Sequence, residues 1–380
     1  MSDMLEFFAA RTEAMVALLD ELVRYESPTS SKPHVDRLSA HVGARCEALG
    51  AEVVVHPRDE TGDLRVAIWH RDAPGRPIML VTHLDTVWPL GTLDTMPIRQ
   101  EGGRFYGPGA VDMKGGVVVA LEAIRGLRDR GELPQRPIWL FMNSDEETGS
   151  VHSRALIEEL ALQAGLVLVM EPGTEEEALK VWRKGIARYT VTVTGRASHA
   201  GNAPEAGINA IIEAAHQALA LHALNDLPNG TSVSVTRIAG GIAGNVIPPE
   251  ASLFVDVRFL KASEAERVDA AVRGLGPTLP GAEMAISGGI DRGPMEYNAQ
   301  MARTVEQARA IATSVGLELH TDGSGGASDG NFTAALGVPT LDGMGAAGAG
   351  LHAAHEHVII RSLPRRAALL ARILRDWEMD

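Results

Sequence analysis

The chain has 380 residues, 45% of them hydrophobic and 22% charged, which is typical of a globular protein with room for two domains. Its net charge of -14 at pH 7 argues against nucleic acid or an anionic membrane as the main partner, because both would repel it. Aromatic residues make up only 4% of the chain, so stacking surfaces for bases or sugars are scarce. The one cysteine, Cys46, excludes an internal disulfide and any site of paired thiolates.

The first 26 residues combine apolar residues with acidic ones, and no basic segment precedes the apolar stretch. This pattern predicts an amphipathic helix and not a secretory signal peptide. No run in the sequence approaches the ~20 apolar residues that a membrane-spanning helix needs. We therefore expect a cytoplasmic protein with no membrane partner.

Short apolar runs then alternate with helical patterns. Strands are predicted at 52–57, 64–69, 78–83, 138–143 and 166–171, with a clear helix at 115–131. Runs that are apolar throughout indicate strands buried on both faces. The pattern therefore predicts an α/β fold in which helices cover both faces of a mostly parallel sheet.

The pattern changes between residues 185 and 292, where the strands alternate apolar and polar residues. Strand, helix, strand, strand, helix and strand follow one another, with the helices at 206–222 and 262–274. This order is typical of a small two-layer α+β unit of the ferredoxin-like kind.

The pattern of short apolar runs and amphipathic helices returns after residue 293, with helices predicted near 299–315 and 363–377. We therefore predict one α/β domain, residues 1–184 and 293–380, that is interrupted by an inserted domain, residues 185–292.

Side chains that can bind a metal stand at the ends of three predicted apolar strands. They are His83 at the end of 78–83, Glu146 and Glu147 shortly after 138–143, and Glu171 at the end of 166–171. Ligands of open α/β sheets bind beyond the carboxyl ends of the strands, so these side chains are expected to meet. Two Gly-rich segments add one candidate each, Asp112 in GPGAVDMKGG and His352 in GMGAAGAGLHAAHEH.

Each of these residues alone has an ordinary explanation. His352 could be a solvated loop histidine, Asp112 a helix N-cap, and the acids after 138–143 a solvated turn. Together they form a set of two imidazoles and three carboxylates, which suits zinc or a neighbouring first-row metal. The predicted ligands are His83, Asp112, Glu147, Glu171 and His352.

Five side chains are too many for one open catalytic zinc. They fit two metals about 3.5–4 Å apart if one carboxylate bridges the pair, with a water between the metals. Because Glu146 and Glu147 are adjacent, one can bind metal while the other acts as general base on that water. Asp85 can accept the second ring N–H of His83 and so fix its tautomer.

Five motifs occur in the order of a known family across nearly the whole chain. They are HLDTV (83–87), GPGAVDMKGG (107–116), NSDEETGS (143–150), MEPG (170–173) and the late Gly-rich loop with His352. The chain in this respect resembles the co-catalytic zinc family of aminoacylases, acetylornithine deacetylases and glutamate carboxypeptidases. Three further segments resemble the glutamate carboxypeptidase branch of this family. They are GRASHAGNAPEAGINAI (195–211), GGIAGNVIPP (240–249) and FVDVRF (254–259).

The resemblance implies a zinc-exopeptidase-like domain with two Zn²⁺ ions per subunit, for which Co²⁺ or Mn²⁺ could substitute. Asp112 would bridge the two ions. His83 and Glu171 would complete one site, and Glu147 and His352 the other.

The family likeness also assigns residues around the metals. Glu146 would be the general base, supported by Asp85. The inserted domain would form a homodimer, and its His199 would reach the partner's active site to steady the scissile carbonyl oxygen. Arg258 and Asn245 would hold the substrate carboxylate and carbonyl.

The segment TEEEALKVWRKG (174–185) is more acidic than expected beside a site for an anionic glutamate. Lys180, Arg183 and Lys184 can offset these acids, or else the specificity is different. Arg292 is a further candidate partner for a substrate carboxylate.

The expected activity is hydrolysis of the amide bond to a C-terminal amino acid of a small N-acyl amino acid or peptide, with glutamate first. Deacetylation, desuccinylation or dipeptide cleavage are related alternatives. A catalytically silent binding protein on this fold is disfavoured, because the five ligands and the base are all present. A serine hydrolase using Ser328 lacks a GxSxG elbow, and the glycines of 102–116 fit neither nucleotide-binding pattern.

Overall fold

The computed structural model describes residues 3–379, which form two compact units. The larger unit runs to Val181 and resumes at Tyr297–Gly323 and from Ser328 onward. The second, which we call the inserted unit, comprises Trp182–Glu296 and Ser324–Ala327. The domain limits of 185 and 292 lie within this inserted unit and stay a prediction.

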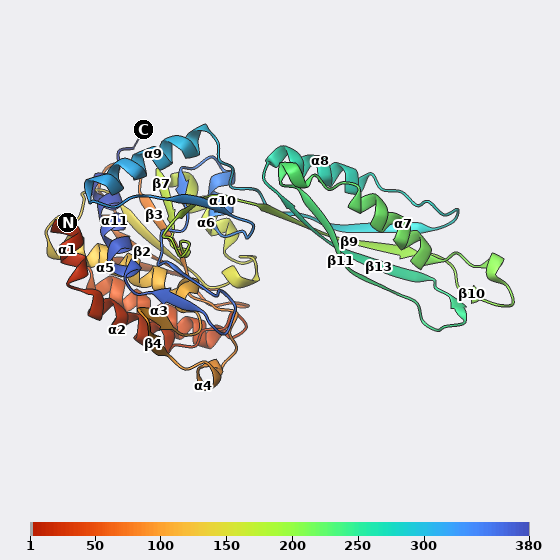
Figure 1. Cartoon of the computed structure of the whole chain (residues 1–380), viewed down its shortest axis with the longest axis horizontal. Coiled ribbons are helices and arrows are strands. Elements are labelled where there is room, and N and C mark those ends of the chain that lie inside the picture. Colours follow the sequence, from red (N-terminus) through yellow and green to blue (C-terminus); the bar gives the residue numbers. More distant parts are fainter. Residues whose placement is uncertain (1–2, 380) are drawn as a thin grey trace. The chain divides into compact units, whose positions relative to one another are not determined.

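A six-stranded sheet forms the centre of the larger unit (Figure 1). Its strands in spatial order are β1 (Glu52–His56), β2 (Leu64–Trp69), β6 (Ile138–Asn143), β3 (Ile78–His83), β7 (Leu166–Val169) and β16 (Thr340–Leu341). The last four run parallel, while β1 and β2 pair antiparallel at one edge. Every residue of β3 is buried, as its continuous apolar run predicts.

Helices cover both faces of this sheet, which confirms the predicted fold class. The helices of the larger unit are α1 (Asp3–Ala9), α2 (Thr12–Val23), α3 (Lys32–Ala48), α4 (Thr92–Thr95), α5 (Gly115–Asp129), α6 (Arg154–Gln163), α9 (Ala299–Ser314), α10 (Gly330–Ala335) and α11 (Ser362–Asp376). Ile157 of α6 packs with Met79 and Val81 of β3. Because side chains alternate along a strand, Leu80 points to the opposite face, where α5 contacts β3 and packs against α11. Within residues 3–379, no helix has the length and apolar composition needed to cross a bilayer.

The single helix expected at the start of the chain is two helices, α1 and α2, in the part that the structure describes. The chain turns at Ala10 and Arg11, and the turn places Arg11 Nε 2.8 Å from Oε2 of Glu122 on α5. Glu122 is buried, so this ion pair compensates a carboxylate that would otherwise be costly to remove from water.

A small antiparallel sheet brings the two Gly-rich segments together. Its strands in spatial order are β17 (Gly348–Ala349), β18 (His357–Ile359), β5 (Arg104–Tyr106) and β4 (Arg99–Glu101). The loop between β17 and β18 carries His352, and η1 (Ala110–Lys114), which follows β5, carries Asp112. The short η2 (Glu146–Thr148) follows β6, while β8 (Leu179–Arg183) pairs with β15 (Thr321–Ser324).

The inserted unit has the predicted ferredoxin-like order of elements. In chain order they are β9 (Gly185–Thr194), α7 (Ala210–His222), β11 (Ser232–Gly240), β13 (Glu250–Phe259), α8 (Ala262–Arg273) and β14 (Glu283–Arg292). The four strands form an antiparallel sheet in the order β11-β13-β9-β14, and both helices cover one face of it (Figure 1). Shorter elements are β10 (Ser198–His199), η3 (Pro204–Ala206), η4 (Leu227–Asn229) and β12 (Val246–Ile247).

Two glycines of the larger unit allow three segments to meet at the end of β7. A Cβ atom added at Gly116, in the first turn of α5, would lie 2.0 Å from the Met170 carbonyl oxygen. A Cβ at Gly345 would lie 2.2 Å from the same oxygen and 2.9 Å from that of Glu171. Only glycine permits this approach, so α5 and the segment before β17 are packed directly against the residue that follows β7.

We expect Gly116→Ala to lower the free energy of unfolding by about 1–3 kcal/mol, because the added methyl group overlaps backbone that cannot move aside. Gly43→Ala is the matched control, since a Cβ there meets side-chain atoms at an ordinary 3.6 Å inside α3. Its improved helix propensity should stabilise the protein by up to about 1 kcal/mol. Urea unfolding of both variants measures the difference, and equal effects would contradict the close-packing argument.

Candidate metal centre

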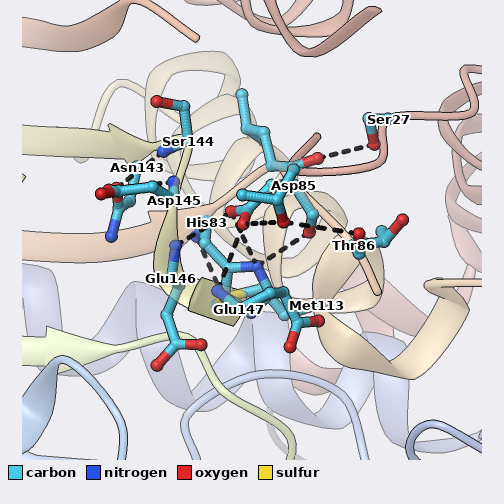
Figure 2. A network of polar contacts seen from close by, with 12 residues as sticks. Ser27, His83, Asp85, Thr86, Met113, Asn143, Ser144, Asp145, Glu146 and Glu147 are labelled. Atoms are coloured by element: carbon cyan, nitrogen blue, oxygen red, sulfur yellow. Dashed lines mark hydrogen bonds and ion pairs between the residues drawn. The ribbon is translucent and has the colours of Figure 1, made fainter. Parts of the chain in front are cut away.

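The parallel strands of the larger unit end at one edge of the sheet, and the predicted ligands gather there. His83 is the last residue of β3, Glu147 lies in η2 directly after β6, and Glu171 follows β7 by two residues. Figure 2 shows His83, Asp85, Glu146 and Glu147 together beyond these strand ends. Their meeting follows from the parallel register of the strands, as expected for an open α/β sheet.

Asp112 lies between two histidines that come from opposite ends of the sequence. Its Oδ1 is 3.1 Å from His83 Nε2, and its Oδ2 is 3.2 Å from His352 Nε2. The same nitrogen of His83 is 3.4 Å from Glu171 Oε1, and that of His352 is 3.2 Å from Glu147 Oε2. The five predicted ligands therefore form one cluster in which each oxygen of Asp112 faces a different imidazole.

The side chains of the cluster differ in their exposure to solvent. His83 is 2% exposed and Asp112 6%, whereas the His352 side chain is 51% exposed at the rim. His352 also has a φ of 59°, in the left-handed region that costs a residue with a side chain about 1–2 kcal/mol. Such strained conformations persist where the surrounding structure enforces them, and they gather at functional sites.

Electrostatics of this cluster indicate a place for positive charge. Hydrogen bonds to Asp112 and Glu147 raise the pKa of His352 to about 10. Burial alone would lower the pKa of His83, but hydrogen bonds to Asp112, Asp85 and Glu171 raise it well above its ordinary value. Burial, together with the nearby Asp112 charge, raises the pKa of Glu147. The surrounding carboxylates thus favour positive charge at both histidine positions.

The donor set fits a metal ion. His83, Asp112 and Glu147 offer ligand atoms that all lie within 4.8 Å of one another. Glu147 Oε1 is buried and has no hydrogen-bond partner, although buried carboxylate oxygens are almost always satisfied. A cation at this position would satisfy that oxygen, and nitrogen with carboxylate oxygen is the donor chemistry that zinc accepts.

Asp85 is fully buried and holds the backbone of η2 in place (Figure 2). Its Oδ1 accepts the N–H of Glu146 and its Oδ2 that of Glu147, both at 3.2 Å. Oδ2 also accepts the Thr29 hydroxyl at 2.7 Å. His83 Nδ1 lies 3.0 Å from the Asp85 backbone oxygen and 3.6 Å from its Oδ1, so the backbone carbonyl is the nearer acceptor for the ring.

The candidate substrate residues lie in the inserted unit. Pairing of β10 with β12 sets His199 opposite Val246, and the Ala200 N–H donates to the Asn245 carbonyl at 2.9 Å. His199 and Asn245, 46 positions apart in the sequence, are therefore neighbours. His199 Nδ1 accepts the N–H groups of Gly201 and Asn202 at 3.1 and 3.0 Å.

Two arginines of the inserted unit lie at one level of its sheet. Arg258 on β13 and Arg292 on β14 are both cross-strand partners of Ile186 on β9, so all three share one face. Arg292 is buried, whereas Arg258 is partly exposed and forms an ion pair with Asp256, with Nε 2.7 Å from Oδ1. The backbone positions of the two arginines thus lie on either side of Ile186.

Two residues that the sequence did not single out also touch the ligand segments. Glu356 is buried and follows the loop that carries His352, and its carboxylate accepts the backbone N–H of Asp112. Trp88, five residues after His83, donates its indole N–H to the same carboxylate. Glu356 is the only acid in the segment GMGAAGAGLHAAHEH, which is a signal that could have drawn attention to it, but its partners are not readable from the sequence.

Comparison with known proteins places the chain in a family. The sequence profile of peptidase family M20/M25/M40 matches residues 79–376, which include all five predicted ligands. This chain belongs to that family. It is therefore a metallopeptidase-family hydrolase, and the resemblance read from the motifs is confirmed.

Relatives cover almost the full chain. Carboxypeptidase G2 of Pseudomonas sp. (strain RS-16) is 33% identical over 97% of this chain and 91% of its own. Succinyl-diaminopimelate desuccinylase 2 of Shewanella loihica is 30% identical over 85% of this chain and 90% of its own. The solved structure of aminopeptidase PepT from Bacillus cereus ATCC 10987 matches with a TM-score of 0.80 and 23% identity, covering 96% of this chain and 98% of that chain. At this identity the structural match shows the shared fold alone.

We expect Asp85→Ala to destabilise the metal-free protein, because the N–H groups of Glu146 and Glu147 lose their acceptor. Each buried donor left without a partner costs about 1–3 kcal/mol. Thr29→Val, which removes only one hydroxyl from Asp85, should have a smaller effect. Urea unfolding in the presence of a chelator measures both variants, and an unchanged midpoint in Asp85→Ala would contradict the anchoring role.

Proposed function

We propose that this chain is a zinc-dependent carboxypeptidase that hydrolyses the amide bond to a C-terminal amino acid, with glutamate as the first candidate. The observation that carries the proposal is Asp112, whose two oxygens face the Nε2 atoms of His83 and His352. The identity with carboxypeptidase G2 over 97% of the chain supports the carboxypeptidase type of activity.

The proposed centre holds two Zn²⁺ ions, with Co²⁺ or Mn²⁺ as possible substitutes. Asp112 would contribute a ligand to both ions, His83 and Glu171 would help to hold one of them, and Glu147 and His352 the other. The contacts support this division, because His83 lies beside Glu171 and His352 lies beside Glu147. Both histidines would bind as neutral rings, so metal binding would release protons.

When bound, two such ions lower the pKa of water and polarise a substrate carbonyl. Glu146 takes a proton from the attacking water and then delivers it to the leaving amine. Its backbone is held through the N–H bond to Asp85, and its neighbour Glu147 is a proposed ligand. Glu146 is thereby kept next to the metals without being one of their ligands.

We assign His199 to the scissile carbonyl oxygen. Because its Nδ1 accepts two backbone N–H groups, the neutral ring carries its proton on Nε2. An Nε2–H group can donate to a carbonyl oxygen on which negative charge develops. Asn245, its neighbour across the β10–β12 pair, is assigned to the same part of the substrate.

The substrate carboxylate is assigned to Arg258 and Arg292, which share one level of the inserted sheet. Guanidinium groups bind carboxylates through paired N–H donors, which favours an acidic terminal residue. Arg258 would exchange its present partner, Asp256, for the substrate.

The inserted unit is also the proposed site of homodimerisation. It exposes large apolar side chains on α7 and β11, among them Leu219 at 70% and Ile238 at 54%. Apolar side chains clustered on an exposed face mark interaction surfaces. In such a dimer, His199 of the partner subunit would complete each active site.

A second candidate is removal of an N-succinyl group, because the desuccinylase of Shewanella loihica is 30% identical over 85% of the chain. A serine hydrolase is disfavoured. The Ser328 hydroxyl is fully buried and donates to the Asp342 carboxylate, so it is neither accessible nor activated by a histidine.

Amine release from a matched set of substrates tests the proposal. N-acetyl-glutamate and N-acetyl-glutamine differ in the side-chain charge, while N-succinyl amino acids and an unblocked dipeptide represent the alternatives. We expect release that is fastest with terminal glutamate, stops after chelation and returns with Zn²⁺. Faster release from a succinyl substrate or from N-acetyl-glutamine would exclude the glutamate assignment, and chelator-insensitive release would exclude metal catalysis.

Glu146→Ala should lower kcat by about 10²–10⁴-fold while the bound metal stays at the wild-type level, because Glu146 moves protons and binds no metal. Glu147→Ala is the matched comparison at the adjacent position and should lose metal. Metal content by elemental analysis, measured beside the rate, separates the two roles. Loss of metal in Glu146→Ala would assign that residue to the ligand set instead.

A further inference from the structure

Four N–H donors occupy the acceptor positions of the Glu356 carboxylate. Oε2 accepts from Trp88 Nε1 at 2.7 Å and from the Gly109 N–H at 2.9 Å. Oε1 accepts from the N–H groups of Val111 and Asp112 at 3.0 and 3.2 Å. Two carboxylate oxygens offer about four acceptor positions, and all are used. Glu356 is therefore not a further metal ligand, although it is fully buried beside the centre.

These contacts join segments that carry the proposed ligands. Glu356 stands four residues after His352, and a Cβ at Gly350 would lie 2.9 Å from its backbone, so the loop is folded tightly on it. Its donors belong to the Asp112 segment and to Trp88, which follows His83 by five residues. One side chain thus ties together the backbone that holds Asp112 and the loop that holds His352.

The Glu356 carboxylate also has a buried cation nearby. Lys114 is buried, donates to the Tyr25 carbonyl at 2.8 Å, and lies close enough to Glu356 for their charges to interact. A buried carboxylate with four donors and a neighbouring ammonium group is held firmly in one place.

We infer, on the basis of the metal centre proposed above, that Glu356 is a positioning residue that sets the spacing between Asp112 and His352 required for binding two metals. Glutamate is needed because only a carboxylate accepts on both sides. In Glu356→Gln, an amide NH₂ would face two N–H groups and leave them without an acceptor. Residues that orient ligands in this way typically contribute about 10–100-fold to metal affinity.

Titration of the chelated, metal-free protein with Co²⁺, followed by absorption spectroscopy, tests this role. Wild-type protein should bind two Co²⁺ ions per subunit. In Glu356→Gln we expect at least one ion to bind about 10–100-fold more weakly, with an altered Co²⁺ spectrum.

Glu213→Gln is the matched control. Glu213 is a buried carboxylate of the inserted unit that accepts the N–H groups of Thr278 and Leu279 and the Gln217 amide. This variant loses the same kind of contact in a unit that contains none of the proposed ligands. It should be less stable, yet it should keep the wild-type Co²⁺ affinity and spectrum.

The outcomes separate the two levels of the proposal. A wild-type protein that binds no Co²⁺ overturns the metal centre and the role of Glu356 with it. Two wild-type ions together with unchanged affinity and spectrum in Glu356→Gln overturn only the role of Glu356. If that variant does not fold, Glu356→Asp and Trp88→Phe replace it, because each removes part of the donor set. Weaker Co²⁺ binding in these two supports the role, and wild-type affinity in both overturns it.

Discussion

Mutual repulsion among buried carboxylates is the constraint that the rest of this structure has to meet. Asp112, Glu147 and Glu171 converge at one edge of the sheet, and two carboxylates 4 Å apart repel by about 4 kcal/mol at an effective dielectric constant of 20. The fold tolerates them only with positive charge between them. The carboxylates raise the pKa of both His83 and His352, and the same positions suit metal ions.

Rigid backbone holds this unfavourable cluster together. Gly116 and Gly345 let α5 and the segment before β17 press against the Met170 carbonyl, next to Glu171. The Asp85 carboxylate accepts the N–H groups of Glu146 and Glu147 in η2 and so holds that segment in place. Glu356 does the same for the segment that carries Asp112. Buried acids that accept backbone N–H groups fix the positions of the acids that face the centre, so similar residues have two different tasks.

The fold and the meeting of the ligands could be predicted because they depend on local signals. An apolar run that is followed by a polar side chain such as His83 or Glu147 indicates both a buried strand and the place where that strand ends. Parallel strands end at the same edge of the sheet, so these side chains meet there. The ferredoxin-like unit was equally visible as an order of elements. Motif order identified the family, while the roles of individual ligands and the limits of the domains stay predictions.

What could not be predicted depends on contacts between distant segments. Trp88 and Glu356 are 268 positions apart, and no local pattern connects them. Arg258 and Arg292 come to one level of the inserted sheet because both pair with Ile186. This depends on the register of three strands, which a single sequence does not give. The break between α1 and α2 follows from the pairing of Arg11 with the buried Glu122, a tertiary contact that overrides the helical pattern.

The division of functional residues between two units has an evolutionary consequence. All five proposed ligands and Glu146 lie in the larger unit, whereas His199, Asn245, Arg258 and Arg292 lie in the inserted unit. Under the proposed assignments, mutations in the inserted unit would change the contacts to the substrate, while the metal ligands and the general base of the larger unit would be inherited unchanged. Relatives named as a carboxypeptidase and as a desuccinylase are 33% and 30% identical to this chain, so different substrate names occur among sequences that match both of its units.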